Sequence, residues 1–222
     1  PEVYRRLGGP PCTYIGHPLI EQVDTLRPGP SELQRRDQAP PVLLVLPGSR
    51  RSEINHHMAV FGETLRALEA DSTALDVVLP TMPHLVEKVT AAVASWPLQP
   101  RIVVGEQEKR AAFRVARAAF AKSGTVTLEL ALARVPMVAA YKAGNIEAWI
   151  ARRVIRSSSV ILANLVIGEN VIPEFIQENC TPENLAPALR DILADSSARR
   201  RQIDAFARLA THLVRIVRGL ER

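Results

Sequence analysis

From residue 42 onward, short aliphatic runs alternate with longer segments whose apolar residues recur every three or four positions. Runs of four or five apolar residues are typical of buried strands, whereas the longer period predicts amphipathic helices. The pattern predicts strands at Val42–Leu46, Leu75–Leu79, Arg101–Val104, Ala118–Ala121 and Met137–Tyr141. It predicts helices after them at Ser52–Ala70, His84–Ser95, Glu108–Val115, Val126–Ala133 and near Ile146–Ile155.

Five strand–helix units predict an α/β fold, in which a doubly wound parallel sheet carries helices on both faces. Residues 1–40 are rich in proline and read as a linker that ends at Pro40-Pro41. The Rossmann-like domain is expected over 41–198, where Thr181 and Pro182 open its last helix, to about Leu193. Residues 199–222 are expected to form a separate amphipathic helix.

Composition places the chain among globular proteins and points to an anionic partner. Of its 222 residues, 47% are apolar and 23% charged, which is enough to build a core. No apolar run approaches the length of a bilayer span. The net charge of +5 favours nucleotide phosphate, nucleic acid or an acidic membrane as partner. Two cysteines and five histidines show no metal-ligand spacing, so we expect no metal site.

The turn Ser123-Gly124-Thr125 is the first candidate site, because it lies between a predicted strand and a predicted helix. Glycine lets backbone N–H groups approach a ligand, and a helix start attracts anions. Glu129 shares a helix face with Thr125, and its carboxylate suits the paired hydroxyls of a ribose. The alternative is a structural role, with Thr125 as N-cap and Glu129 compensating the helix dipole. The stretch alone leaves both open.

The turn Pro47–Arg50 is the second candidate, because it offers a glycine, a hydroxyl and a guanidinium beside a helix start. These groups suit a diphosphate, although the turn matches neither a P-loop nor a dinucleotide fingerprint. Its alternative is an N-cap with exposed arginines. Every turn that follows a predicted strand lies at the carboxyl edge of the sheet, where open α/β sheets bind ligands.

The tail places apolar residues at alternating three- and four-residue spacing, namely Ile203, Phe206, Ala210, Leu213, Val217 and Leu220. Arginines flank this stripe at positions 199, 200, 201, 208, 215 and 218. We favour packing of this helix on its own domain over a membrane or partner surface. The aromatic content of 5% argues against single-stranded nucleic acid as partner.

Several of these motifs together resemble the lipid-A-disaccharide synthase family. The matching stretches are Gly16–Leu19, Leu46–Arg50, Ser123–Glu129, Pro136–Val138 with Tyr141, and Asn164 with Pro173, Glu174 and Gln177. The resemblance implies the nucleotide-binding half of a GT-B glycosyltransferase, with residues 1–40 as the end of the crossover between halves. It also implies inverting transfer from UDP-2,3-diacylglucosamine to 2,3-diacylglucosamine 1-phosphate, without metal or cofactor.

The same resemblance implies a role for individual residues. Gly48, Ser49 and Arg50 would bind the diphosphate together with the Ser123–Thr125 helix start, and Glu129 would bind the ribose. The backbone near Gly105 would contact the uracil, and Asn164 would lie near the donor sugar. The general base is expected in an acceptor domain that this sequence lacks, with His17 as a minor candidate.

The resemblance further implies a cytoplasmic enzyme, peripheral on the inner face of the bacterial inner membrane, with a homodimer as an open alternative. Two positions depart from the family pattern: Ala163 replaces a proline and Glu169 replaces an arginine. Two other functions remain open at this point. One is a different GT-B glycosyltransferase or a UDP-sugar epimerase, and the other is a basic interaction module.

Overall fold

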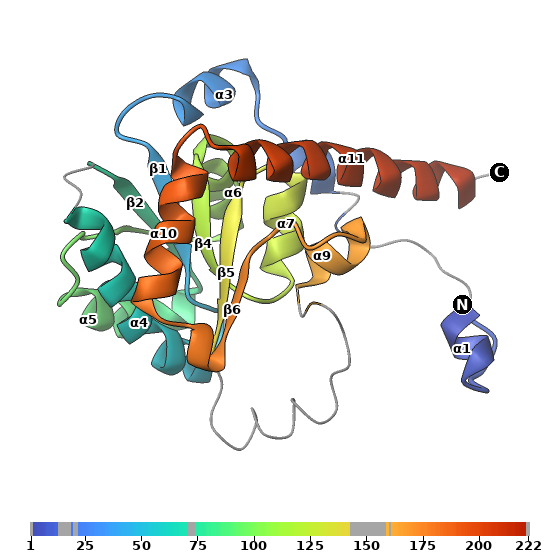
Figure 1. The fold of residues 1–222 in the computed structure, drawn as a ribbon, viewed down its shortest axis with the longest axis horizontal. Coiled ribbons are helices and arrows are strands. Elements are labelled where there is room, and N and C mark those ends of the chain that lie inside the picture. The colour runs from blue at the N-terminus through green and yellow to red at the C-terminus, as the bar shows by residue number, and fades with distance from the viewer. Residues whose placement is uncertain are drawn as a thin grey trace.

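The computed structural model describes residues 2–12, 19, 22–70, 74–142, 159 and 161–220. Its centre is a six-stranded sheet in the order β3-β2-β1-β4-β5-β6, in which every neighbouring pair is parallel (Figure 1). The strands are β1 Val42–Leu46, β2 Asp76–Thr81, β3 Arg101–Val104, β4 Ala118–Lys122, β5 Met137–Tyr141 and β6 Glu174–Ile176. The predicted doubly wound parallel sheet is therefore confirmed.

Helices cover both faces of the sheet, because each central strand is apolar on both sides. Val42, Leu44 and Leu46 of β1 belong to one buried cluster, and Leu43 and Val45 to the other. The first face carries α2 Val23–Leu26, α6 Glu106–Val115, α7 Val126–Leu132, α9 Leu162–Ile167 and part of α11 Ser197–Leu220. The second carries α4 Arg51–Glu69, α5 Val86–Val93 and α10 Pro182–Leu193.

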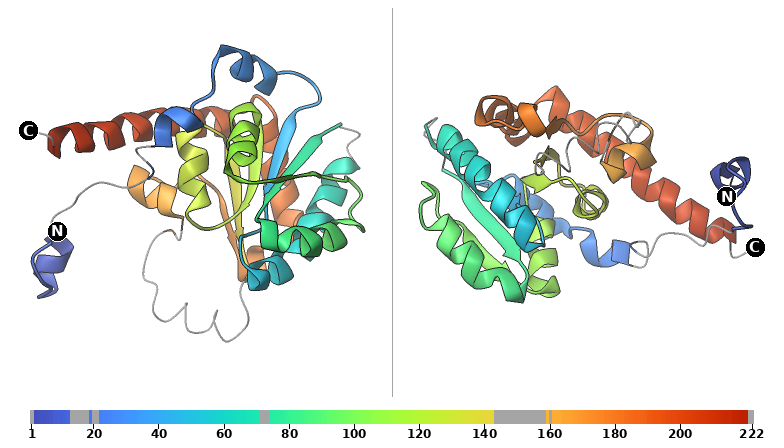
Figure 2. Two further views of the ribbon diagram at one scale, coloured as in Figure 1. Left: turned by 180° about the vertical axis from the view of Figure 1, so that it is seen from behind. Right: turned by 90° about the horizontal axis from the view of Figure 1, so that it is seen from below.

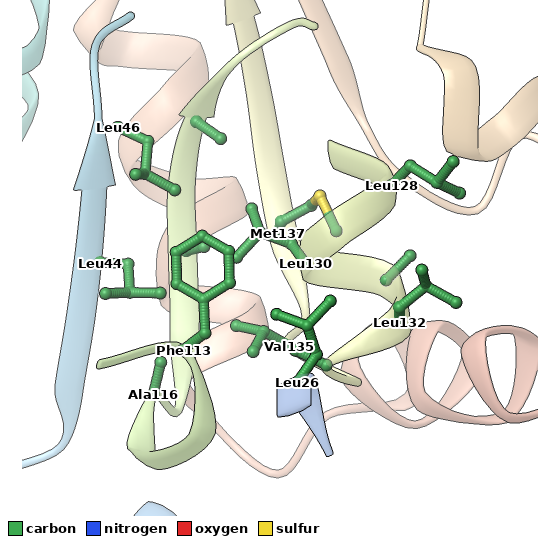
Figure 3. Close-up of a cluster of buried hydrophobic side chains, with 14 of the residues drawn as sticks. Leu26, Leu44, Leu46, Phe113, Ala116, Leu128, Leu130, Leu132, Val135 and Met137 are labelled. Carbon is green, nitrogen blue, oxygen red and sulfur yellow. The ribbon is translucent and has the colours of Figure 1, made fainter. Parts of the chain in front are cut away.

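The first cluster fixes α7 against the sheet. Figure 3 shows Leu130 of α7 next to Met137 of β5. Leu128 and Leu132 of α7 and Phe113 of α6 belong to the same buried cluster. All five side chains are at most 1% exposed. Such packing stabilises a short helix that could not persist alone. It leaves the opposite face of α7, which carries Glu129, free to border a cavity.

Some predicted elements differ from the structure. The predicted helix His84–Ser95 is a 3₁₀ turn, Pro83–Leu85, followed by the shorter α5. Strand β6 was not predicted, because three residues beginning with Glu174 give too short an apolar run. The apolar segment Ile161–Ile167 is mostly helix α9. The predicted helix near Ile146–Ile155 lies outside the described residues.

The described residues before β1 form the helices α1 Glu2–Arg6, α2 and α3 Pro30–Arg36. Of these, α2 and α3 pack beside α6. Arg36 is 5% exposed and donates hydrogen bonds to carbonyls of Phe113, Arg114, Ala133 and Arg134 at 2.8–3.1 Å. These carbonyls lie at the C-terminal ends of α6 and α7, where a positive charge interacts favourably with the helix dipole. Burial lowers the pKa of Arg36 to about 10, so it stays charged at neutral pH.

Helix α11 starts on the domain and extends well past it (Figures 1 and 2). Phe206 of the predicted apolar stripe and the neighbouring Leu209 are buried in the first cluster, so the helix up to Leu209 packs on the domain. Arg199, expected to flank the apolar stripe, is instead 6% exposed and donates to the carbonyls of Arg117 and Ile192. In the described part of the chain, no helix combines the length and the apolar character needed to cross a membrane.

Candidate functional site

A cavity of about 480 Å³ lies at the carboxyl edge of the sheet, within the size range of small-molecule sites. It opens where the strand order reverses, since β1 pairs with β2 on one side and β4 on the other. Such switch points are where open α/β sheets bind ligands. The lining residues are Leu46, Gly48, Ser49, Arg50, Glu53, Pro80, Thr81, Met82, Pro83, Gly105, Glu106, Lys109, Lys122, Gly124, Thr125, Val126 and Glu129.

The turn between β1 and α4 borders this cavity with Gly48, Ser49 and Arg50. Gly48 has φ +133°, and a Cβ added there would lie 2.5 Å from the Cβ of Glu53. Only glycine suits this position. The Oε2 atom of Glu53 accepts hydrogen bonds from the N–H groups of Ser49 at 2.8 Å and Arg50 at 3.2 Å. The helix-capping role, which the sequence left open as the alternative for this turn, is filled by the Glu53 carboxylate.

Lys122 adds a second contact to the same carboxylate. Its Nζ lies 3.1 Å from Oε1 of Glu53, and the two side chains are 16% and 14% exposed. Lys122 ends β4, so it reaches the turn from the neighbouring strand. Burial alone would raise the pKa of Glu53, but the hydrogen bonds from Ser49, Lys122 and Arg50 outweigh it and lower the pKa. Glu53 is therefore an anion at neutral pH.

Glu129 borders the cavity from the first turn of α7. Its Oε2 lies 2.8 Å from Nζ of Lys109 on α6, and Lys109 also contacts Glu106 at 2.9 Å. Burial opposes the charged form of Lys109, but both carboxylates outweigh it and raise its pKa. The side chain of Thr125 makes no capping hydrogen bond. The structural alternative made Thr125 the N-cap and Glu129 a residue that compensates the helix dipole. The structure does not support its first part, the capping by the Thr125 side chain.

His57 connects the β1–α4 region to the end of β5. Its Nδ1 lies 2.7 Å from the carbonyl oxygen of Glu53, and its Nε2 accepts the N–H of Lys142 at 3.0 Å. Because Nε2 accepts, Nδ1 carries the proton and the ring is neutral. Burial is the main cause of its lowered pKa. His57 thus fixes the start of α4 relative to the residue that follows β5.

Most predicted site residues meet in this one cavity. Gly48, Ser49, Arg50, Gly105, Gly124, Thr125 and Glu129 all border it. Ser123 does not border it; its side chain is 7% exposed, and its N–H donates to the carbonyl of Ala140. His17 lies outside the described residues.

Asn164 does not border the cavity either. It is 2% exposed, and its amide exchanges two hydrogen bonds with the backbone of Ile172 and donates a third to Glu174. The Glu174 carboxylate also contacts the Ser159 hydroxyl. These bonds connect α9 to β6, so in this structure the Asn164 side chain organises the backbone. Of the two departures from the family pattern, Ala163 is buried in the core, and Glu169 contacts Arg208 at 3.2 Å.

Sequence reasoning did not assign four charged residues of the cavity to the site, namely Glu53, Glu106, Lys109 and Lys122. A signal existed for Glu53, because an acidic residue three positions after the helix cap is typical of a capping box. Lys122 ends a strand at the binding edge, which could have marked it. Lys109 lies 20 positions before Glu129 and gave no such signal. In the described part of the chain, no cluster of His, Cys, Asp and Glu side chains could hold a metal ion.

The sequence matches a family model described as lipid-A-disaccharide synthetase over residues 1–218. A lipid-A-disaccharide synthase from Nitrobacter hamburgensis is 79% identical over 209 residues, which are 94% of this chain and 53% of that protein. The enzyme of that name from Rhodospirillum centenum is 43% identical, covering 92% of this chain and 52% of its own length. The chain therefore spans about half the length of these curated relatives.

Solved structures share the fold at low sequence identity. MurG from Acinetobacter baumannii aligns with a TM-score of 0.54 and 18% identity over 88% of this chain and 55% of its own. The Anabaena protein Alr3699/HepE, solved with UDP and glucose, aligns with a TM-score of 0.56 and 12% identity over 99% of this chain and 59% of its own. Both likenesses establish the fold class alone.

Proposed function

Because the chain belongs to the lipid-A-disaccharide synthase family, we propose that it is the donor-binding half of an inverting GT-B glycosyltransferase. Its donor is UDP-2,3-diacylglucosamine and its acceptor is 2,3-diacylglucosamine 1-phosphate. Transfer forms the lipid A disaccharide and releases UDP. In this proposal residues 41–198 bind the UDP-sugar and residues 1–40 are the end of a crossover from an acceptor-binding half.

One observation carries this proposal: Glu129 and the Gly48–Arg50 turn border the same cavity from opposite sides of the strand-order reversal. A carboxylate can accept both hydroxyls of a ribose, whereas backbone N–H groups and cations bind phosphate oxygens. The part of the cavity at α7 therefore offers the Glu129 carboxylate for the ribose, and the part at the Gly48–Arg50 turn offers backbone N–H groups and cations for the phosphates. Each part also contains an ion-pair partner of the opposite charge, Lys109 beside Glu129 and Glu53 beside Lys122. Gly105, with φ +99°, borders the same cavity and leaves space for a base.

The chain's own residues would stabilise the departing UDP. As the glycosidic bond to the diphosphate breaks, negative charge grows on its oxygens, and fixed cations lower the barrier. Arg50 and Lys122 both border the cavity, and we assign this role to them. The general base that takes the acceptor proton is assigned to the acceptor-binding half, so this chain alone is expected to bind UDP without turnover. We place the enzyme in the cytoplasm, peripheral on the anionic inner face of the inner membrane.

Calorimetric titration with UDP and 2′-deoxy-UDP tests this proposal. The wild-type chain should prefer UDP, and Glu129→Ala should weaken UDP binding about ten- to hundred-fold and remove the preference. Thr125→Ala is the control on the same helix face and should cost less. Equal affinity of the wild type for both nucleotides would contradict the ribose assignment. Tighter binding of an acylated donor than of UDP-N-acetylglucosamine would separate this function from an epimerase.

A further inference from the structure

The turn assigned to the diphosphate already contains an anion that belongs to the protein. The carboxylate of Glu53 accepts hydrogen bonds from the backbone N–H groups of Ser49 and Arg50. It also forms ion pairs with the Lys122 ammonium at 3.1 Å and the Arg50 guanidinium at 3.5 Å. Backbone N–H groups and cations around one carboxylate are the donors that also bind phosphate. We propose that Glu53 is a built-in competitor, which occupies the diphosphate site and must give up these donors when the nucleotide binds.

Glu53 and a phosphate compete because the turn has few hydrogen-bond donors. Each backbone N–H has one hydrogen, so Ser49 and Arg50 cannot serve a phosphate oxygen fully while they serve Glu53. A phosphate beside an ionised Glu53 would also place two like charges in a partly buried site. Binding of the diphosphate therefore exchanges Glu53 for phosphate at the same groups. The exchange lowers the affinity for every diphosphate ligand and leaves a neutral nucleoside unaffected.

The geometry lets the carboxylate return when the ligand leaves. Glu53 sits in the first turn of α4, and its Cβ is held beside Gly48. Rotation about its side-chain torsions moves the carboxylate without moving the helix. This inference rests on the proposed function, since it assigns to Glu53 the release of UDP from the same site. The two roles of Glu53 predict opposite effects. As a purely structural cap, Glu53 would hold the turn in shape and thereby strengthen phosphate binding, whereas as a competitor it weakens phosphate binding.

The test removes the charge of the Glu53 side chain and keeps its shape. Glu53→Gln retains an oxygen that can accept the Ser49 N–H, and Glu63→Gln is the matched control on an exposed position of the same helix. Calorimetry with UDP, uridine and inorganic pyrophosphate is performed on the wild type and both variants, and thermal unfolding confirms that each is folded. Glu53→Gln should bind UDP and pyrophosphate about tenfold more tightly, with uridine unchanged. Glu63→Gln should match the wild type.

The outcomes separate this inference from the proposed function. If UDP binds the wild type but Glu53→Gln binds UDP equally or more weakly, Glu53 is a structural cap and the inference is overturned. If UDP binds no variant, the proposed function fails. Tighter pyrophosphate binding by Glu53→Gln would then still support competition at the turn, and unchanged pyrophosphate binding would overturn it. A faster release of UDP from the wild type than from Glu53→Gln, measured by stopped flow, is the expected kinetic counterpart.

Discussion

The Nζ atom of Lys109 lies 2.8 Å from the Oε2 atom of Glu129, and this ion pair connects α6 to α7 at the rim of the cavity. Both side chains are about four-fifths buried, at 21% and 17% exposure. The lysine uses one oxygen of the carboxylate and limits its rotation. A ligand that donates to Glu129 therefore meets a carboxylate already oriented by α6.

We predict that Lys109→Met weakens uridine binding and reduces the preference for UDP over 2′-deoxy-UDP by about three- to tenfold, because Glu129 loses its partner. Lys109→Arg should preserve most of the preference. Lys88→Met, on α5 outside the cavity, should change neither value. If Lys109→Met kept the full preference, Glu129 would not depend on α6 for its orientation.

Arg50 and Arg51 provide a comparison between adjacent residues. Arg50 borders the cavity, whereas Arg51 is exposed and does not. Arg50→Ala should weaken UDP binding about tenfold through the loss of a charge-assisted contact, and it should leave uridine binding nearly unchanged. Arg51→Ala should affect neither ligand. Titrations at two salt concentrations check the assignment, and an equal effect on UDP and uridine would argue against a phosphate contact.

The sequence predicted the backbone framework better than the side-chain contacts. Strands such as Val42–Leu46 were found because both of their faces are buried, and such a strand has a continuous apolar run. The edge strand β6 was not predicted, because its pairing with β5 makes it a strand and its short sequence has no strand-like apolar pattern. The place of Gly48 at the cavity edge could be predicted from topology, since every strand of a parallel sheet ends at the same edge, and that of Glu129 required its helical spacing from Thr125 as well.

Side-chain partners were harder to predict, because they join residues far apart in sequence. Glu53 and Lys122 are 69 positions apart, and only the pairing of β1 with β4 brings them together. Asn164 is a second example. The family resemblance implied that it lies near the donor sugar, which stays a prediction, and the structure adds its hydrogen bonds to Ile172 and Glu174. Burial of an amide requires such partners, and the sequence does not tell which partners it takes.

His57 should make stability depend on pH. Burial holds its pKa below the ordinary value of about 6.5, so in this range the unfolded chain binds more protons than the folded one. Its contribution is fully present above pH 6.5 and is lost as pH falls through the lowered pKa. Lys122, Glu53 and His56 are the charged or titratable neighbours that also affect this pKa. The free energy of unfolding should therefore decrease on acidification, with a slope of at most about 1.4 kcal/mol per pH unit from this group.

Urea unfolding between pH 7.5 and 5 measures this effect. His57→Gln should be less stable than the wild type at pH 7.5, because the contacts to Glu53 and Lys142 weaken, and its stability should fall less steeply below pH 6.5. His56→Asn, at an exposed neighbouring position, should retain the wild-type slope. Identical slopes for the wild type and His57→Gln would show that another group dominates the acid response.

Arg36 should contribute more to stability than the surface arginine Arg27. Its guanidinium serves four carbonyls at the ends of α6 and α7, the helices that carry Lys109 and Glu129. Arg36→Leu leaves these carbonyls without their donors in a buried site, and it should lower the free energy of unfolding by about 3 kcal/mol. Arg27→Leu removes a surface pair with Asp24 at 3.9 Å and should cost less than about 1 kcal/mol. Equal losses for the two variants would mean that water replaces the Arg36 hydrogen bonds.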